Sequence, residues 1–487
     1  SVQHHNVPCL LKHPKLMAEI SSSPGQVSHA EDPGSADTPD AISKLVVEGF
    51  KSLANRTEIE IRPLTLLAGA NSSGKSSAMQ PLLLLKQTLE APFDPGPLLL
   101  DGPNVKFTSQ SQLFSSFQFS GSEEFSILIT LTEKTEIRAT FEQANDSGPI
   151  LKRFRFREKE PGLDQTDYLY EERHVFDLKP GMSQETLKKA LPKHMQRQAE
   201  MRSQGQDSEE PILRLHQNRF FLTPEYSRSL PREFMSRSWG SVDFALQTVS
   251  QKIEESLHVP GLRDNPSRTY KTTAVGNRFP GTFDTYVASV IHAWQREDDE
   301  RLPRLADQLQ YLGLTGNVAA ERVNDTQVEL QVAQQPIGAS EERMINVADV
   351  GIGVSQVLPV LVAMLAAEPG QLVYVEQPEI HLHPRAQALL ADPIVEAANR
   401  GVRVVVETHS QLLLLAIQTR IAEDKIDPED VMLHWFSRDP KTGITDVDSV
   451  QPDEKGAFGE WPEDFSEVEL EWQDKYLDAA EKHLFGS

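Results

Sequence analysis

The sequence is poor in cysteine and has no long apolar stretch. Cys9 is its single cysteine among 487 residues, so neither an internal disulfide nor a cysteine metal cluster can form. That composition suits a reducing compartment. No apolar run is long enough to cross a membrane, and the polar, histidine-containing start of the chain does not resemble a secretory signal. We therefore expect a cytoplasmic protein with no membrane partner.

Positive charge is also scarce. The 48 lysines and arginines are outnumbered by 72 aspartates and glutamates, which gives a formal net charge of −24. Nucleic-acid binding relies on many basic contacts to phosphate, so direct binding would need a local basic patch, an assembly or a partner. The best patch, residues 151–159, alternates Lys and Arg with Phe, a pattern that favours the solvated face of a strand over a nucleic-acid contact. An acidic surface suits docking to a basic partner protein.

The length allows two or three domains or lobes. Residues 1–40 are rich in Ser, Pro, His, Gly and Asp without hydrophobic periodicity, which predicts a mobile tail. Residues 41–179 predict an N-terminal lobe of strands around a phosphate loop, and residues 316–487 predict a C-terminal lobe in which strands alternate with helices. Charged helical patterns predict a helical insertion over residues 180–315. The alternation of strands and helices indicates an α/β fold with a largely parallel sheet.

Residues 64–77 carry the strongest motif. They read LTLLAGANSSGKSS and match the phosphate-loop pattern G-x-x-x-x-G-K-[ST] between an apolar strand and a helix, a context that a chance glycine turn would lack. The glycines let backbone N–H groups face phosphate oxygens, and the helix N-terminus adds partial positive charge. We expect Lys75 to reach the β- and γ-phosphates of ATP and the Ser76 hydroxyl to bind Mg²⁺. The predicted nucleotide-binding residues of this loop are Gly69, Asn71, Ser73, Gly74, Lys75, Ser76 and Ser77.

Three further stretches place polar groups at the ends of apolar segments. Glu376 follows the apolar run 372–375, and a carboxylate at that edge of a sheet is suited to Mg²⁺. Residues 349–356 form a glycine-rich turn in which Ser355 can cap the following helix and help to bind an anion. His409 follows the apolar run 404–406 after one Glu and one Thr. It could sense a γ-phosphate or the attacking water, although a lone histidine at a strand end is usually structural.

Together these motifs resemble those of prokaryotic ABC-type ATPases of the SMC-like class. The similarity is greatest to AAA ATPases related to OLD-family proteins and to ATPase subunits of phage-defence systems. The most telling runs are DVGIGVSQVLP from residue 349 and EQPEIHLHP from residue 376, and residues 461–465 look like the family's ending. The resemblance covers roughly residues 42–130 and 316–470. It implies an ABC-type P-loop ATPase head with a mixed sheet, interrupted by a helical insertion.

The resemblance also implies roles for single residues. Glu376 would be the Walker B carboxylate that holds Mg²⁺, and His409 would be the switch histidine. Gly353, Ser355 and Gln356 would form the signature that closes on ATP bound to a second copy of the chain. Two chains would then hold two nucleotides head to tail, as a homodimer or within a higher oligomer.

Two points stay open under this resemblance. His381 and His383, with Glu379 nearby, could suggest a metal site, but their segment falls on the family's dimer-facing loop, which disfavours that interpretation. The Q-loop glutamine is either Gln110 or Gln112.

One position departs from the family pattern. Many ABC-type ATPases place a glutamate, the general base, directly after the Walker B acid, and here that position holds Gln377. An amide can orient water but cannot accept its proton. Glu379 could substitute, and otherwise the chain is a slow hydrolase or a switch that holds ATP. The predicted catalytic residues are Lys75, Glu376, Gln377, Glu379 and His409.

These expectations support one leading hypothesis and two alternatives. The leading hypothesis is a Mg²⁺-dependent ATPase that dimerises on ATP and controls a partner effector, a nuclease or toxin, in antiviral defence. The first alternative is a scaffold in which ATP joins subunits without turnover. The second is a DNA-repair ATPase of the SMC kind, which the net charge of −24 and the lack of sustained heptads disfavour.

Overall fold

The computed structural model describes residues 40–116, 124–132, 135–144, 148–160, 171–190, 213–226, 239–273, 276, 278–334 and 343–459. The predicted tail, apart from residue 40, and residues 461–465 lie outside this described part. All elements discussed below belong to one compact unit.

A six-stranded sheet forms the centre of the fold. Its order is β10-β15-β16-β3-β17-β18, and every neighbouring pair is parallel except β17 and β18. This arrangement confirms the predicted mixed sheet. The strands are β3 (Leu64–Gly69), β10 (Leu257–Val259), β15 (Leu372–Glu376), β16 (Arg403–Glu407), β17 (Val431–Arg438) and β18 (Thr445–Val450).

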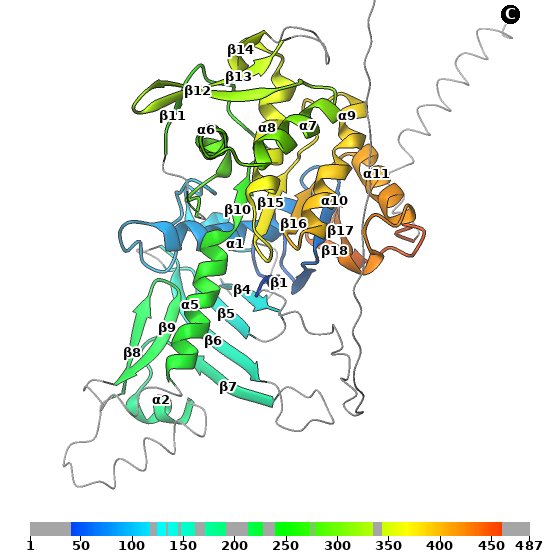
Figure 1. Cartoon of the computed structure of the whole chain (residues 1–487). Coiled ribbons are helices and arrows are strands. Elements are labelled where there is room, and N and C mark those ends of the chain that lie inside the picture. Colours follow the sequence, from blue (N-terminus) through cyan, green and yellow to red (C-terminus); the bar gives the residue numbers. More distant parts are fainter. Residues whose placement is uncertain are drawn as a thin grey trace, which may run out of the picture. The chain divides into compact units, whose positions relative to one another are not determined.

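Both faces of the central sheet are covered, which explains the nearly continuous apolar runs of its strands. On β3, Leu64 and Leu66 pack into one hydrophobic cluster with helices α6, α8, α10 and α11, while Leu67 packs into a second cluster with α1 and α5. Figure 1 shows α8 and α10 beside β15 and β16. These helices are α1 (Lys75–Glu90), α5 (Trp239–Glu255), α6 (Val287–Glu297), α8 (Ile352–Ala366), α10 (Ala391–Asn399) and α11 (Gln411–Ala422).

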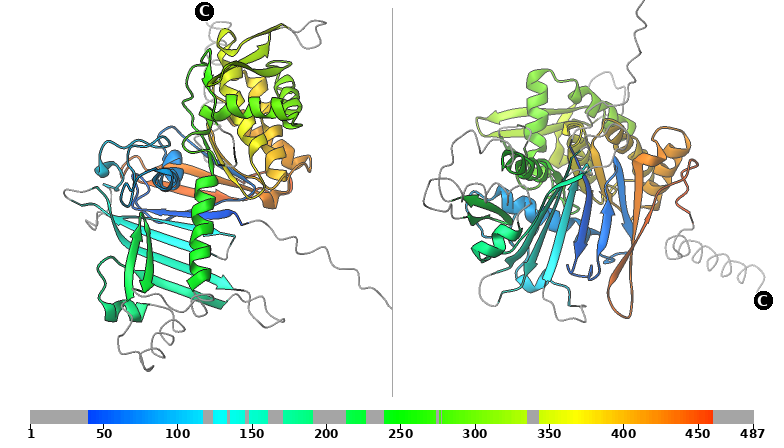
Figure 2. Two further views of the ribbon diagram at one scale, coloured as in Figure 1. Left: turned by 60° about the vertical axis from the view of Figure 1, so that its left-hand side comes forward. Right: turned by 90° about the horizontal axis from the view of Figure 1, so that it is seen from below.

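A second sheet is antiparallel throughout, in the order β2-β1-β4-β5-β6-β7. Figure 2 shows α5 crossing its strands, and α5 shares a hydrophobic cluster with them. The strands are β1 (Ile42–Glu48), β2 (Thr57–Glu60), β4 (Glu124–Leu131), β5 (Thr135–Glu142), β6 (Ile150–Glu160) and β7 (Glu171–Leu178).

The basic stripe noted in the sequence lies on β6. Arg153 and Arg155 both pair with Asp177 of β7, at 3.5 and 3.0 Å. Lys152 pairs with Glu124 and Glu142. These cations therefore face carboxylates of their own sheet, which agrees with the interpretation of a solvated strand face.

Residues 180–315 differ from the helical insertion that we expected, because strands as well as helices form there. Strands β8 (Leu213–Asn218) and β9 (Phe221–Tyr226) make a hairpin, and β10 joins the central sheet in parallel with β15. All three residues of Leu257–Val259 are buried, although β10 lies at the edge of the sheet and contains His258. The helices of this part are α2 (Gln184–Ala190), α5, α6 and α7 (Arg301–Tyr311), with the 3-10 turn η2 (Phe283–Tyr286). Residues 183–202 have a charged helical sequence pattern, and most of that stretch lies outside the described residues.

The remaining elements are a small sheet, a divided helix and short 3-10 turns. A small sheet contains β11 (Tyr270–Lys271), β12 (Val318–Asn324), β13 (Gln327–Ala333) and β14 (Met344–Asn346). The helical sequence pattern of residues 385–399 forms two helices, α9 (Pro384–Leu389) and α10, because Pro393 lacks the N–H that would continue the hydrogen-bond ladder. Short 3-10 turns are η1 (Gln110–Gln112), η3 (Val347–Asp349) and η4 (Pro428–Asp430). Among the described residues, none of the helices combines the length and apolar character that a membrane span needs.

Candidate nucleotide-binding site

The turn between β3 and α1 needs its glycines. Gly69 and Gly74 have φ values of 140° and 106°, and Ser72 between them has 61°. A Cβ on Gly69 would lie 2.2 Å from the carbonyl oxygen of Phe436, and one on Gly74 would lie 2.6 Å from the Thr445 hydroxyl. Positive-φ positions close together in a short turn can give it a concave shape in which backbone N–H groups face an anion. The turn therefore has glycines where its backbone requires them, as a phosphate loop would need.

Lys75 and Ser76 begin helix α1 at the end of this turn. The Lys75 ammonium donates to the carbonyls of Gly69 and Ala70, at 3.1 and 2.8 Å. Burial lowers the pKa of Lys75, and the nearby carboxylates, Glu407 first, oppose that shift. The ammonium is therefore held at the loop that it is expected to serve.

The Ser76 hydroxyl meets a carboxylate that the sequence analysis did not single out. It donates to Oε1 of Glu407 at 2.9 Å, while the buried hydroxyl of Tyr374 donates to Oε2 at 2.7 Å. Burial raises the pKa of Glu407, and these two hydrogen bonds work against that increase. The sequence carries a signal for this carboxylate, since Glu407 ends an apolar strand two residues before His409.

A cavity of about 860 Å³ opens in front of the loop. Its lining includes the loop residues Asn71, Ser72, Gly74, Lys75, Ser76 and Ser77, together with Gln377, Glu407 and His409. Three further cations line it, Lys51, Lys106 and Arg438. The sequence does not reveal that these cations gather, because they come from separate loops and a strand end. Their gathering in a chain of net charge −24 makes the cavity suited to an anion.

The structure distinguishes the two Q-loop candidates. The Gln110 side chain bonds both the carbonyl and the N–H of Ala144, whereas Gln112 lines the cavity and accepts a hydrogen bond from the Thr108 N–H at 2.9 Å. Gln112 is thus the glutamine that can contact a ligand there.

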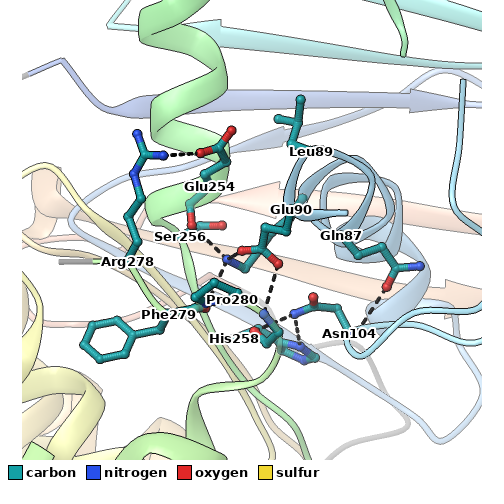
Figure 3. A network of polar contacts seen from close by, with 12 residues as sticks. Gln87, Leu89, Glu90, Asn104, Glu254, Ser256, His258, Arg278, Phe279 and Pro280 are labelled. Carbon is teal, nitrogen blue, oxygen red and sulfur yellow. Dashed lines mark hydrogen bonds and ion pairs between the residues drawn. The ribbon is translucent and has the colours of Figure 1, made fainter. Parts of the chain in front are cut away.

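Glu376 has both carboxylate oxygens engaged elsewhere. Oε1 accepts from His258 Nε2 at 3.1 Å, and Oε2 accepts from the Gly261 N–H at 3.1 Å. Burial raises the pKa of Glu376, but the bonds from His258 and Gly261 outweigh it, so the net shift is downward. Figure 3 shows Asn104 against the ring of His258, where its amide nitrogen lies 3.3 Å from Nδ1. Glu376 is not among the residues that line the described cavity.

The residues after Glu376 turn back toward the loop. Gln377 has a φ of 43° and lines the cavity, and its N–H donates to the Glu407 carbonyl at 2.7 Å. A non-glycine residue with positive φ costs free energy and often marks a functional position. Glu379 is buried, and its Oε1 accepts from the Thr408 hydroxyl at 2.8 Å and the His409 N–H at 2.9 Å. Its Oε2 is buried without a hydrogen-bond partner among the described residues.

The histidines separate into two groups. His409 lines the cavity, and burial and the nearby Lys75 lower its pKa, so the ring is neutral near pH 7. His383 caps α9 by accepting from the Arg385 N–H at 3.3 Å, and His381 is exposed with a φ of 66°. Within the described residues no three His, Cys, Asp or Glu side chains gather as a metal group.

The predicted signature residues begin helix α8. Gly353 leaves room for the His381 carbonyl, which would lie 3.3 Å from an added Cβ. Ser355 donates to the Ile352 carbonyl at 2.8 Å, and Gln356 is buried with its Nε2 3.4 Å from the Asp264 carbonyl. Gly353, Ser355 and Gln356 are all missing from the lining of the described cavity.

The donor set fits a nucleoside triphosphate with Mg²⁺. A buried lysine and a glycine turn suit phosphate oxygens, while the Ser76 hydroxyl and the Glu407 carboxylate are the hard oxygen donors that Mg²⁺ prefers. The Oγ atom of Ser73, buried in the same loop, has no hydrogen-bond partner among the described residues.

Comparison with solved structures finds SMC heads at low identity. A SmcHead bound to the C-winged helix domain of ScpA is 12% identical, with a TM-score of 0.41, over 85% of this chain and 98% of that one. The SMC head domain from Thermotoga maritima is 12% identical, with a TM-score of 0.35, over 84% and 99%. The Smc head with an extended coiled coil bound to the C-terminal domain of ScpA, from Pyrococcus furiosus, is 13% identical, with a TM-score of 0.40, over 91% and 100%.

No curated protein matches the chain. A family model does match, over residues 64–416, and it is described as "AAA domain, putative AbiEii toxin, Type IV TA system". The match spans the phosphate loop, the signature segment and the strands that end at Glu376 and Glu407, and it confirms the predicted AAA relationship. The chain is a member of this AAA domain family of ATPases.

Proposed function

We propose that this chain binds MgATP in the cavity before the phosphate loop and hydrolyses it slowly. The observation that carries the proposal is the joint position of Lys75 and Ser76 at a glycine turn that opens on a cation-lined cavity. Lys75 and the loop N–H groups would hold the phosphates, and Ser76 would bind Mg²⁺. The metal supplies neutralisation of phosphate charge when it is bound.

Slow turnover is supported by the residues nearest the phosphates. Gln377 lines the cavity, and its amide can position a water molecule but cannot take a proton from it. Glu379 is buried behind it, with one oxygen committed to Thr408 and His409. Neutral His409 can accept a hydrogen bond from the water or donate one to a phosphate.

We also propose that ATP joins two copies of the chain. Gly353, Ser355 and Gln356 are not part of the lining of the described cavity, so they do not complete the site in their own chain. The Ile352 side chain beside them is 40% exposed, which leaves an apolar contact available to a second copy. Each nucleotide would then lie between the phosphate loop of one chain and Ser355 of the other.

The partner of such a dimer would be an effector, a nuclease or toxin of an antiviral defence system in the cytoplasm. The description of the matched family, which names a toxin of a toxin–antitoxin system, supports this proposal. The net charge of −24 favours a basic partner protein over direct contact with nucleic acid.

Equilibrium binding of MgATP to the wild-type chain and to Lys75→Ala tests the proposal. Lys425→Ala is the matched control, because Lys425 is an exposed lysine whose ammonium pairs with the nearby Glu423. We expect Lys75→Ala to lose ATP affinity and phosphate release while Lys425→Ala keeps both. Equal ATP affinity in all three proteins would refute the proposed site.

Gln377 also supports the scaffold alternative, in which bound ATP is never hydrolysed. Phosphate release measured with and without the effector partner separates the two. Turnover that remains zero in both conditions, while ATP still binds, would favour the scaffold.

A further inference from the structure

The carboxylate closest to the proposed metal-binding hydroxyl is on the strand next to the phosphate loop. Strand β16 pairs directly with β3, and their register places Glu407 opposite Leu67. Its Oε1 then lies 2.9 Å from Ser76 Oγ. Because Mg²⁺ binds oxygen ligands at about 2.0–2.1 Å, a carboxylate that already bonds the serine hydroxyl is within reach of a cation on that hydroxyl or of its bound water.

Glu407 is also fixed in this position. The Tyr374 hydroxyl donates to its second oxygen at 2.7 Å, and both side chains are almost fully buried. A carboxylate whose second oxygen is held by a hydrogen bond presents its first oxygen in one direction. Tyr374 itself is stacked against the ring of His258, with ring centroids 5.5 Å apart and an interplanar angle of 10°.

Glu376, one strand further from the loop and paired in register with Glu407, makes its carboxylate hydrogen bonds to groups other than the Ser76 hydroxyl. His258 and the Gly261 N–H take its two carboxylate oxygens, and Arg263 donates to its backbone carbonyl at 2.8 Å. His258 is fixed in turn by Asn104, as Figure 3 shows, so the Nε2 hydrogen faces the carboxylate. These contacts come from β10 and the loop that follows it, more than 100 residues before Glu376 in the sequence.

We infer that Glu407, and not Glu376, supplies the carboxylate of the Mg²⁺ site beside Ser76. Glu376 instead joins β15 to β10 through His258. This inference rests on the proposed binding of MgATP. The metal-site carboxylate would then lie at the end of β16, directly before Thr408 and the switch histidine His409.

The test compares two isosteric substitutions on neighbouring strands, Glu407→Gln and Glu376→Gln. The affinity of a fluorescent ATP analogue is measured for each protein in Mg²⁺ and in EDTA, and Mn²⁺ binding to the ADP complex is followed by electron paramagnetic resonance. In the wild type, Mg²⁺ should tighten nucleotide binding. Loss of a group that orients or supplies a metal ligand typically weakens metal affinity by about 10–100-fold, and we expect a loss of that size in Glu407→Gln. Glu376→Gln should keep the Mg²⁺-dependent gain and the Mn²⁺ signal.

Each other outcome has a defined meaning. A loss in Glu376→Gln as large as that in Glu407→Gln, or an unchanged Mg²⁺ effect in Glu407→Gln, would overturn the inference. Glu407→Asp keeps the carboxylate and should recover part of the metal effect even if Glu407→Gln folds poorly; no recovery in folded Glu407→Asp would also count against it. Failure of the wild type to bind the analogue in either buffer would refute the proposed function instead.

Discussion

Lys86 and Glu90 form a buried ion pair one turn apart on α1, the helix that begins with Lys75. The Lys86 side chain is 0% exposed and that of Glu90 is 9% exposed. The ammonium has three acceptors, namely the Glu90 carboxylate and the carbonyls of Glu254 and Phe279, which matches its three N–H donors. Figure 3 shows Glu90 beside Phe279 and Pro280. Burial lowers the pKa of Lys86 and raises that of Glu90, so each charge depends on the other.

Replacing Lys86 by Met leaves the Glu90 carboxylate buried with one donor, the Gly281 N–H at 2.9 Å. Removing one member of a buried pair costs about 3–5 kcal/mol of unfolding free energy, because the other charge stays uncompensated. The double variant Lys86→Met/Glu90→Gln removes that charge as well. Since the two side chains are in contact, the double variant should be more stable than the sum of the single effects predicts, by about 0.5–3 kcal/mol.

Urea unfolding of the wild type, the two single variants and the double variant measures these changes in the free energy of unfolding. Lys189→Met is the control, because Lys189 and Glu185 have the same four-residue spacing but side chains 74% and 81% exposed. An exposed ion pair contributes about 0–1 kcal/mol to the free energy of unfolding, so Lys189→Met should change stability little. Equal small effects of Lys86→Met and Lys189→Met, or strict additivity in the double variant, would refute the reasoning.

Three other predictions follow from single positions. Gln377→Glu should raise ATP turnover by about 10²-fold or more, because a carboxylate there can act as general base; an unchanged rate of phosphate release would show that Gln377 does not occupy that position. Gly69→Ala should abolish nucleotide binding or folding, because its Cβ would lie 2.2 Å from a backbone oxygen at a φ of +140°, whereas Gly276→Ala, with nothing within 4 Å, should bind ATP normally. Burial lowers the pKa of His434, whose two ring nitrogens form hydrogen bonds with the Ser449 hydroxyl and the Glu60 carbonyl. The unfolded state therefore binds more protons than the folded state between the folded-state pKa and about 6.5. Stability from this group is full above that range and is lost as the pH falls, so urea midpoints should decrease from pH 7.5 to 5.5 less steeply in His434→Gln than in the wild type.

The sequence predicted the elements whose signals are local. Strands β15 and β16 are apolar runs that end in Glu, and the turn between β3 and Lys75 is specified by Gly69 and Gly74. The alternation of Thr and Ile with Glu along β2 is likewise a local signal, and burial alternates with it. Such features could be read from neighbouring residues alone.

The rest depended on contacts between distant segments. Whether Glu376 or Glu407 faces Ser76 is decided by strand register and by His258, which lies 118 positions before Glu376. The three-residue strand β10 was too short to detect inside a region of helical patterns, and it is a strand because β15 pairs with it. The cations of the cavity, such as Lys51, were not detected for the same reason.

The proposed function depends most on a site shared between two copies of the chain. Mixing Lys75→Ala with Ser355→Arg tests this directly, because a pair formed from the two variants contains one site with both an intact phosphate loop and an intact signature. Neither variant alone should form an ATP-dependent dimer or release phosphate, and the mixture should regain both. If both variants are folded and the mixture stays as inactive as its components, the shared site is contradicted.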